Sequence, residues 1–169
     1  MAVFDLTLLT DGLRLAVVAI LLFAALHDVV TRTVPNGVAI ALAIATTAVA
    51  LSDDRLIWGL GFGATVFVVC LLCWLRGWIG GADVKLLGAA AIIVAPADVG
   101  TFPLAVTLSG GLLALAYMFG PTILPRPTPK RPRGLIGRIL RVEAWRIHHR
   151  GPLPYACAIA AGTLFVLSS

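Results

Sequence analysis

The chain alternates between long apolar runs and short connections that contain charged residues, proline or glycine. Cutting it at these connections leaves six apolar segments. Their residues are continuously apolar and do not alternate with a period of two, which favours membrane helices over the strands of a barrel. The six predicted spans are Leu13–Val30, Gly37–Leu51, Leu56–Leu75, Leu86–Val99, Phe102–Gly120 and Pro152–Leu167.

Two of these segments are short for a membrane span. Gly37–Leu51 and Leu86–Val99 have 15 and 14 residues, whereas a hydrocarbon core of roughly 30 Å requires about 20. Short spans are accommodated by locally thinned bilayer or by helical extension into the flanking loops. We therefore expect about six transmembrane helices, and five spans with one re-entrant segment is the alternative.

Composition supports a membrane protein with a single domain. The 169 residues are 60% hydrophobic and 12% charged, with a mean hydropathy of +1.01, whereas a soluble domain is about half apolar and a quarter charged. We expect one integral-membrane domain over residues 1–169, folded as an all-α bundle. The first run follows Asp5 and Asp11 and lacks a basic n-region, so we interpret it as a retained span and not as a signal peptide.

Charged residues are divided unequally between the two sides of these spans. Of the 13 Lys and Arg residues, 11 lie in the first, third and fifth connections, and 8 of these lie in the fifth, the basic loop 121–151. Under the positive-inside rule these connections are cytoplasmic, and the N-terminus and the C-terminus are both outside. Asp28 and Asp83 then lie at cytoplasmic helix ends. The other side holds Asp5, Asp11, Asp53, Asp54 and Asp98.

The basic loop has two different halves. Pro121–Arg133 is too rich in proline for a helix and is predicted to be extended. The second half predicts a short amphipathic helix, with Arg138 and Arg141 opposite an apolar face, in the anionic inner-leaflet interface. A solvated positive loop is the alternative, and nucleic-acid binding is not expected because no aromatic platform accompanies the charges. The apolar face consists of Leu135, Ile136, Ile139, Leu140 and Val142.

Two aspartates are the main candidates for chemistry. A carboxylate next to hydrocarbon is costly, so such residues persist mainly where they face a wet interior. Asp28 and Asp83 stand on separate segments at the same predicted depth, which indicates a carboxylate pair. The alternatives are structural, with Asp28 pairing with Arg32 on the same helical face and Asp83 capping the fourth span.

Three short motifs stand out in the sequence. Two contain the aspartates, and the third leads into the last apolar segment. The first runs from Asp28 to Val34-Pro35-Asn36, and the second is Gly80-Gly81-Ala82-Asp83-Val84-Lys85-Leu86. The third, Gly151-Pro-Leu-Pro154-Tyr155, leads into a run of small residues ending at Gly162. In this order and spacing they resemble the motifs of type IV prepilin peptidases, and the resemblance covers essentially the whole chain. It implies supporting roles for Arg32, Pro35, Asn36, Gly80, Gly81, Ala82 and Lys85.

The chain departs from the family pattern in two places. Ala82 stands where the GxGD signature has its second glycine, a residue that permits a positive φ or a close backbone approach. The connection Thr31–Asn36 has no room for the insert with two CxxC pairs found in the larger, bifunctional members. The chain therefore resembles the short, peptidase-only form of tight-adherence pilus systems.

The resemblance implies a membrane-embedded aspartic endopeptidase with Asp28 and Asp83 as catalytic residues. Its substrate would be a Flp-like type IV prepilin, cut at the cytoplasmic face of the bacterial inner membrane. Two neighbouring carboxylates hold a single proton and act with water, so no cofactor is expected. No metal is expected either, because the CxxC of Cys70 and Cys73 lies inside an apolar run without further ligands. The alternatives are a small ion- or proton-coupled transporter using the two aspartates and a catalytically silent pilus-assembly relative.

Overall fold

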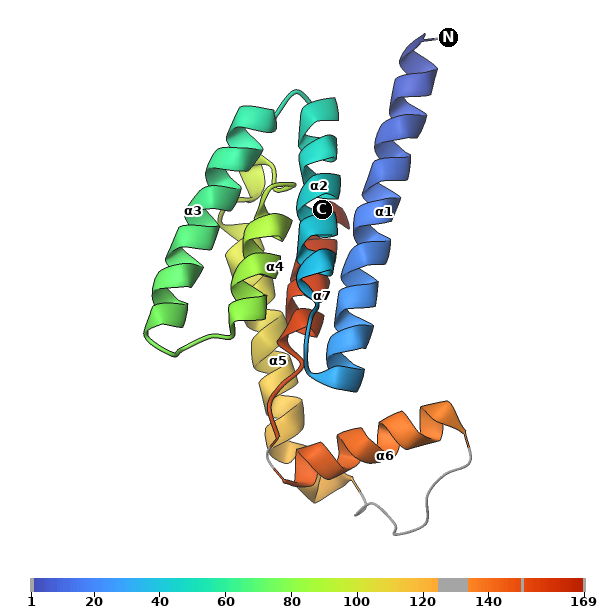
Figure 1. Ribbon diagram of the computed structural model, residues 1–169, viewed down its shortest axis with the longest axis vertical. Coiled ribbons are helices and arrows are strands. Elements are labelled where there is room, and N and C mark those ends of the chain that lie inside the picture. The colour runs from blue at the N-terminus through green and yellow to red at the C-terminus, as the bar shows by residue number, and fades with distance from the viewer. Residues whose placement is uncertain (1, 125–133, 150, 169) are drawn as a thin grey trace.

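The computed structural model describes residues 2–124, 134–149 and 151–168, and every regular element within these ranges is a helix (Figure 1). Helices α1–α5 and α7 form a bundle, and α6 lies across one end of it (Figure 1). The elements are α1 (Ala2–Thr31), α2 (Asn36–Ser52), α3 (Leu56–Leu75), α4 (Gly81–Ala91), the 3₁₀ helix η1 (Pro96–Asp98), α5 (Thr101–Ile123), α6 (Leu135–His148) and α7 (Tyr155–Ser168).

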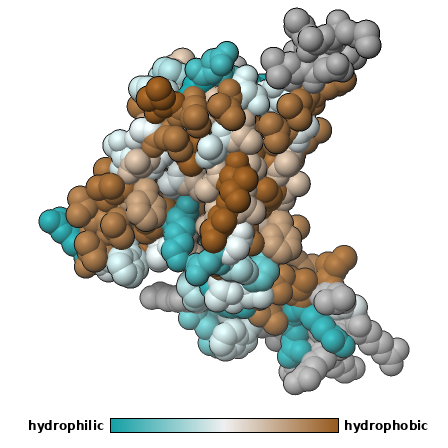
Figure 2. Space-filling view, turned by 45° about the horizontal axis from the view of Figure 1, so that its top comes forward, coloured by the Kyte–Doolittle hydropathy of each residue, from teal (hydrophilic) through white to brown (hydrophobic). Residues whose placement is uncertain are grey.

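Within the described residues, three helices are long and apolar enough to cross a membrane, over Leu8–Thr31 in α1, Leu56–Leu75 in α3 and Thr101–Ile123 in α5. Helices α2 and α7 are apolar but shorter, at 17 and 14 residues. Hydrophobic side chains cover much of the flank of the bundle, and hydrophilic ones gather toward its ends (Figure 2). The prediction of an all-α membrane protein is confirmed, whereas six spans and two outside termini remain predictions.

The fourth segment differs most from its prediction. The sequence predicts a span over Leu86–Val99, but α4 covers Gly81–Ala91 and is followed by a turn and η1. A helix of 11 residues is only about 16 Å long, roughly half of the hydrocarbon core. The chain leaves the helix before Pro96, because a proline ring disfavours helical backbone in the residue that precedes it. Helices α2, α3 and α7 all contact α4.

Small residues let the helices of the bundle approach one another closely. A Cβ added at Gly63 would lie 3.0 Å from a carbonyl oxygen of α4, and one at Gly162 would lie 2.6 Å from a backbone nitrogen of α5. Gly110 faces the α7 side, whereas Gly61 and Gly111 have nothing within 4 Å. In each of the pairs Gly61/Gly63 and Gly110/Gly111, only one glycine therefore lies at a close contact between helices. Residues one or two positions apart in a helix point to different faces.

The end of the bundle away from α6 is held by ion pairs to Asp53. Its Oδ2 accepts hydrogen bonds from Arg14 at 3.1 Å and from Arg55 at 2.5 Å. Burial raises the pKa of Asp53, but the two guanidinium groups lower it more, and the net pKa is below its usual value. Arg14 and Arg55 are the two basic residues that the charge pattern places on the side opposite the other 11. Both pair with Asp53, which neutralises part of their charge there.

The structure corrects the predicted start of the basic loop. Pro121 lies inside α5, which continues to Ile123, so the extended prediction is wrong for these residues. A proline is tolerated there because it removes one hydrogen bond close to the helix end. Residues 125–133 lie outside the described residues. The predicted helix of the second half is present as α6, with Ile136 and Leu140 exposed at 75% and 64%.

Candidate functional site

The last turn of α1 and the first turn of α4 lie at the same end of the bundle, the end over which α6 lies (Figure 1). Asp28 stands in the last turn of α1 and Asp83 in the first turn of α4. Asp28 is only 8% exposed, and the charges of the two carboxylates are close enough to repel each other. Two chain segments that are 55 residues apart in sequence thus place their acidic side chains at one site.

The N-terminus of α7 supplies a hydrogen-bond donor to this site. The backbone N–H of Ala156 donates to Oδ2 of Asp28 at 3.2 Å. The first N–H groups of a helix have no partner within the helix and carry its positive dipole end, so they favour an anion. Tyr155 lies within electrostatic range of Asp83 and packs its ring against Gly110 of α5. Three helices therefore meet at the carboxylates.

Of the two structural alternatives for the aspartates, the described residues exclude the Asp28–Arg32 ion pair and keep a capping contact for Asp83. The guanidinium of Arg32 pairs with Glu143 and donates to the Tyr117 hydroxyl at 2.7 Å, and it makes no ion pair with Asp28. The N-cap of α4 is Gly80, and Asp83 is the third residue of the helix. Asp28 therefore lacks the pairing role. Asp83 is not the N-cap residue, but its carboxyl group interacts with the backbone N–H of the N-cap residue Gly80, as a third helical residue does in a capping box.

The supporting residues of the two aspartate motifs contact one another. Lys85 Nζ donates a hydrogen bond of 2.7 Å to Oδ1 of Asn36. Pro35 is the N-cap residue of α2, with φ −60° and ψ 142°, and Asn36 begins the helix. The fixed φ of proline suits this extended residue at a helix start. The motif segments therefore join directly, in addition to meeting through the carboxylates.

The glycines of the second motif leave room for neighbouring side chains. A Cβ at Gly80 would lie 2.9 Å from Oδ2 of Asp83, and one at Gly81 would lie 3.3 Å from Nε1 of Trp74. Ala82 is an ordinary helical residue of α4. Within the described residues Ala82 does not have a positive φ, so this position makes no use of the conformational freedom of a glycine.

An apolar groove of about 570 Å³ opens between α2, α3 and α4. Asn36 and Lys85 line part of it, and Lys85 is two residues beyond Asp83. The remaining lining is apolar or small and includes Ile40, Ala64 and Phe67. The groove thus borders the same two motifs that carry the aspartates.

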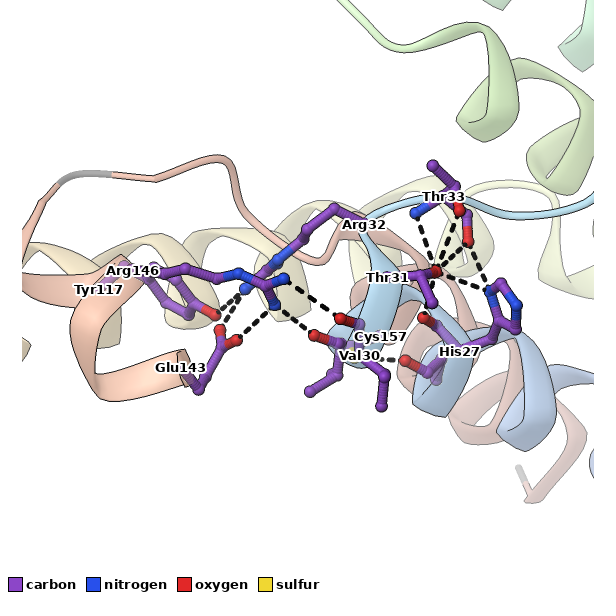
Figure 3. Close-up of polar contacts among 11 residues, drawn as sticks. His27, Val30, Thr31, Arg32, Thr33, Tyr117, Glu143, Arg146 and Cys157 are labelled. Carbon is purple, nitrogen blue, oxygen red and sulfur yellow. Dashed lines mark hydrogen bonds and ion pairs between the residues drawn. The ribbon is translucent and has the colours of Figure 1, made fainter. Parts of the chain in front are cut away.

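A network of charged residues at the end of α1 was not predicted from the sequence. It joins Arg32, Glu143 and Arg146 with the hydroxyl of Tyr117 and the last carbonyls of α1 (Figure 3). One signal points to it, because Glu143 is the only glutamate of the chain and stands within the strongly basic loop. An isolated acidic residue among so many basic ones is a candidate for ion pairing.

Fold and site together define a helical membrane protein with two acidic side chains meeting at one end of its bundle. The chain belongs to the type IV leader peptidase family, whose family model matches residues 15–119, more than half of the sequence. This makes it a membrane-bound protease. Comparison with curated proteins and with solved structures gave no match. The matched region contains both aspartates, whereas α6 and α7 lie beyond it.

Proposed function

We propose that the protein is an aspartic endopeptidase that removes the leader of a Flp-like type IV prepilin at the cytoplasmic face of the bacterial inner membrane. The observation that carries this proposal is the placement of Asp28 and Asp83 at the same end of the bundle, near enough for their charges to interact, with the Ala156 N–H on the Asp28 carboxylate. Membership of a leader peptidase family supports hydrolysis as the reaction.

The two carboxyl groups would act with one water molecule. In the proposed mechanism the pair holds one proton, since a second negative charge beside the first is unfavourable. Asp28, which accepts the Ala156 N–H, is the ionised partner and takes a proton from water as the water oxygen attacks the scissile carbonyl carbon. Asp83 donates its proton to the carbonyl oxygen. Collapse of the tetrahedral intermediate then breaks the C–N bond: Asp28 gives the proton it took from water to the leaving amine, and the hydroxyl that came from the carbonyl returns its proton to Asp83.

The groove between α2, α3 and α4 offers a place for the apolar helix of the prepilin. A prepilin is cut between a short basic leader and an apolar helix. Lys85 and Asn36 line the groove at the motifs, and Ile40 and Phe67 give it an apolar wall. A substrate helix lying against this wall would have its cytoplasmic end beside Asp83, which is where the peptide bond must be presented.

The proposed orientation places the aspartates and α6 on the cytoplasmic side. Six spans with both termini outside follow from the charge pattern. Helix α6 then lies in the interface of the anionic inner leaflet, with exposed Ile136 and Leu140 toward the acyl chains. Basic residues of the loop 121–151 would contact lipid headgroups.

Cleavage of a co-expressed Flp-like prepilin tests the proposal. The wild-type protein should convert the prepilin to a shorter product with a defined new N-terminus, measured by mass spectrometry. Asp28→Asn and Asp83→Asn preserve shape, should insert normally into the membrane, and should lower the rate at least about 100-fold. Asp54→Asn, at an exposed position in the α2–α3 connection, is the matched control and should cleave normally.

Near-normal cleavage by either active-site variant would disprove the carboxylate pair. Absence of cleavage by a folded wild-type protein, tested with several Flp-like prepilins, would disprove the peptidase. Coupled ion movement without cleavage would instead support the transporter.

A further inference from the structure

The last turn of α1, which carries Asp28, is held from outside the bundle by α6. The guanidinium of Arg146 donates to the carbonyl oxygens of Val29 at 2.6 Å and Val30 at 3.1 Å (Figure 3). The last carbonyls of a helix have no hydrogen-bond partner within it and form the negative end of its dipole. A guanidinium group therefore both donates hydrogen bonds to them and offsets their partial negative charge. Arg146 therefore fixes the two residues that directly follow Asp28.

Glu143 stands between two arginines in this network. Its Oε2 accepts a hydrogen bond from Arg146 at 3.1 Å, and its Oε1 pairs with Arg32. These three side chains are only 11–18% exposed. Removing the carboxylate would leave two guanidinium groups close together and largely shielded from water, which is a strongly unfavourable arrangement. Glu143 is therefore the group on which the network depends.

Arg32 transmits this constraint to the backbone of Asp28. Its own N–H donates to the Asp28 carbonyl oxygen at 2.8 Å, and its φ of 58° lies in the left-handed region. A non-glycine residue in that region costs roughly 1–2 kcal/mol, so contacts elsewhere must hold it. Those contacts are Glu143 and the Tyr117 hydroxyl, with the Arg32 guanidinium 5.7 Å from the centre of the Tyr117 ring.

We infer that Glu143 and Arg146 are positioning residues, which set the place of the Asp28 carboxylate through the end of α1 and through Arg32. The inference rests on the proposed function. Both residues lie in α6, outside the region matched by the family model. The cytoplasmic helix thus becomes part of the support of the site, and not only a basic connection.

The kinetic test separates positioning from substrate binding. Glu143→Gln and Arg146→Gln should each lower kcat for prepilin cleavage about 10- to 100-fold, since small displacements of a catalytic group are costly, and should leave KM within about twofold. The double variant Arg32→Gln/Glu143→Gln should have a kcat no lower than that of the less active single variant. Losses of kcat do not add when the residues act as a unit. Arg76→Gln, an exposed arginine of the α3–α4 connection, is the matched control.

A second readout does not require cleavage. Cys157 Sγ donates to the carbonyl oxygen of Ala25 at 3.6 Å, at the contact of α7 with the turn that precedes Asp28. In a chain with Cys70 and Cys73 replaced by serine, the alkylation rate of Cys157 by a small permeant reagent reports this contact. Arg146→Gln should raise the rate several-fold; it is the variant used here because Glu143 itself interacts electrostatically with the thiol.

The outcomes are distinguishable. A raised KM with unchanged kcat would overturn the inference, since α6 would then bind the substrate leader. Unchanged kinetics and unchanged alkylation in Arg146→Gln would overturn it as well. If the wild type cleaves no prepilin, the proposed function fails, whereas the alkylation rate still decides whether Arg146 holds the end of α1.

Discussion

The ammonium group of Lys85 donates a hydrogen bond of 2.7 Å to the side-chain oxygen of Asn36, 49 positions earlier in the chain. Asn36 follows Asp28 in the first motif, and Lys85 follows Asp83 in the second. The bond joins the start of α2 to the first turns of α4, so it restrains the distance between the two segments that carry the aspartates.

Loss of this bond should therefore slow cleavage. Lys85→Met and Asn36→Leu each remove one partner, and a charge-assisted hydrogen bond at an exposed position is worth about 1 kcal/mol. We expect about a fivefold fall in kcat for either variant and no further fall when both are combined. Prepilin cleavage rates check this. Additive losses would show that the two side chains act separately.

Gly80→Ala should impair cleavage with little effect on stability. A Cβ there would lie 2.9 Å from the Asp83 carboxylate oxygen, and the carboxylate can rotate away at low energetic cost. Rotation moves the acid out of place, so we expect at least a tenfold loss of kcat and a Tm within a few degrees of the wild type. Gly37→Ala is the control, because nothing lies within 4 Å of that Cβ. Equal activities of the two variants would contradict this role of Gly80.

Ala82→Gly should leave cleavage the same as the wild type or raise it modestly. It restores the family signature, and the helical backbone at this position already accepts alanine without strain. The expected cost is local, about 1 kcal/mol of helix propensity. Cleavage rate and thermal stability, measured together, check the prediction. A severe loss of activity would mean that the Ala82 methyl group contributes to the site.

Ala64→Trp should weaken substrate binding by filling the groove between α2, α3 and α4. Ala64 lies on the groove wall and is exposed, so a large side chain there occupies space without disturbing the core. We expect KM for prepilin to rise about tenfold with kcat largely retained. Ala16→Trp, at an exposed position on α1, should have no such effect. Equal KM values for the two variants would place the substrate helix elsewhere.

Topology is tested with single cysteines in a chain whose Cys70, Cys73 and Cys157 are replaced by alanine. The positive-inside rule places residue 54 outside and residue 134 in the cytoplasm, and both positions are exposed. Asp54→Cys should react with an impermeant thiol reagent on intact cells, and Gly134→Cys should react only after the membrane is opened. Labelling of residue 134 from outside would place the aspartates at the wrong face for a cytoplasmic leader.

Most of the fold could be predicted from the sequence, because continuous apolar runs specify membrane helices locally. Leu56–Leu75 matches α3 residue for residue. The prediction failed at Leu86–Val99, where the alanines, isoleucines and valine of Ala89–Val94 are buried by neighbouring helices and not by lipid. Apolar composition does not distinguish these two environments, and only the tertiary packing of α4 explains why so short a helix is stable.

The sequence predicted only those parts of the candidate site that are side chains within short motifs. Asp28 and Asp83 were found from their cost in an apolar setting. The Ala156 donor was not, because it is a backbone group and any residue type supplies it. The contacts of Glu143 and Arg146 with the end of α1 were also missed, since they span more than 100 positions, and the local i,i+3 pairing of the two residues does not reveal them.

The hydrogen bond from Ala156 to Asp28 also affects the order in which the site is assembled during synthesis and membrane insertion. The two residues are 128 positions apart, so α7 is made long after α1. Asp28 enters the bilayer without this donor, which arrives only when α7 inserts. A chain that stalls before α7 is made therefore carries an unfinished site.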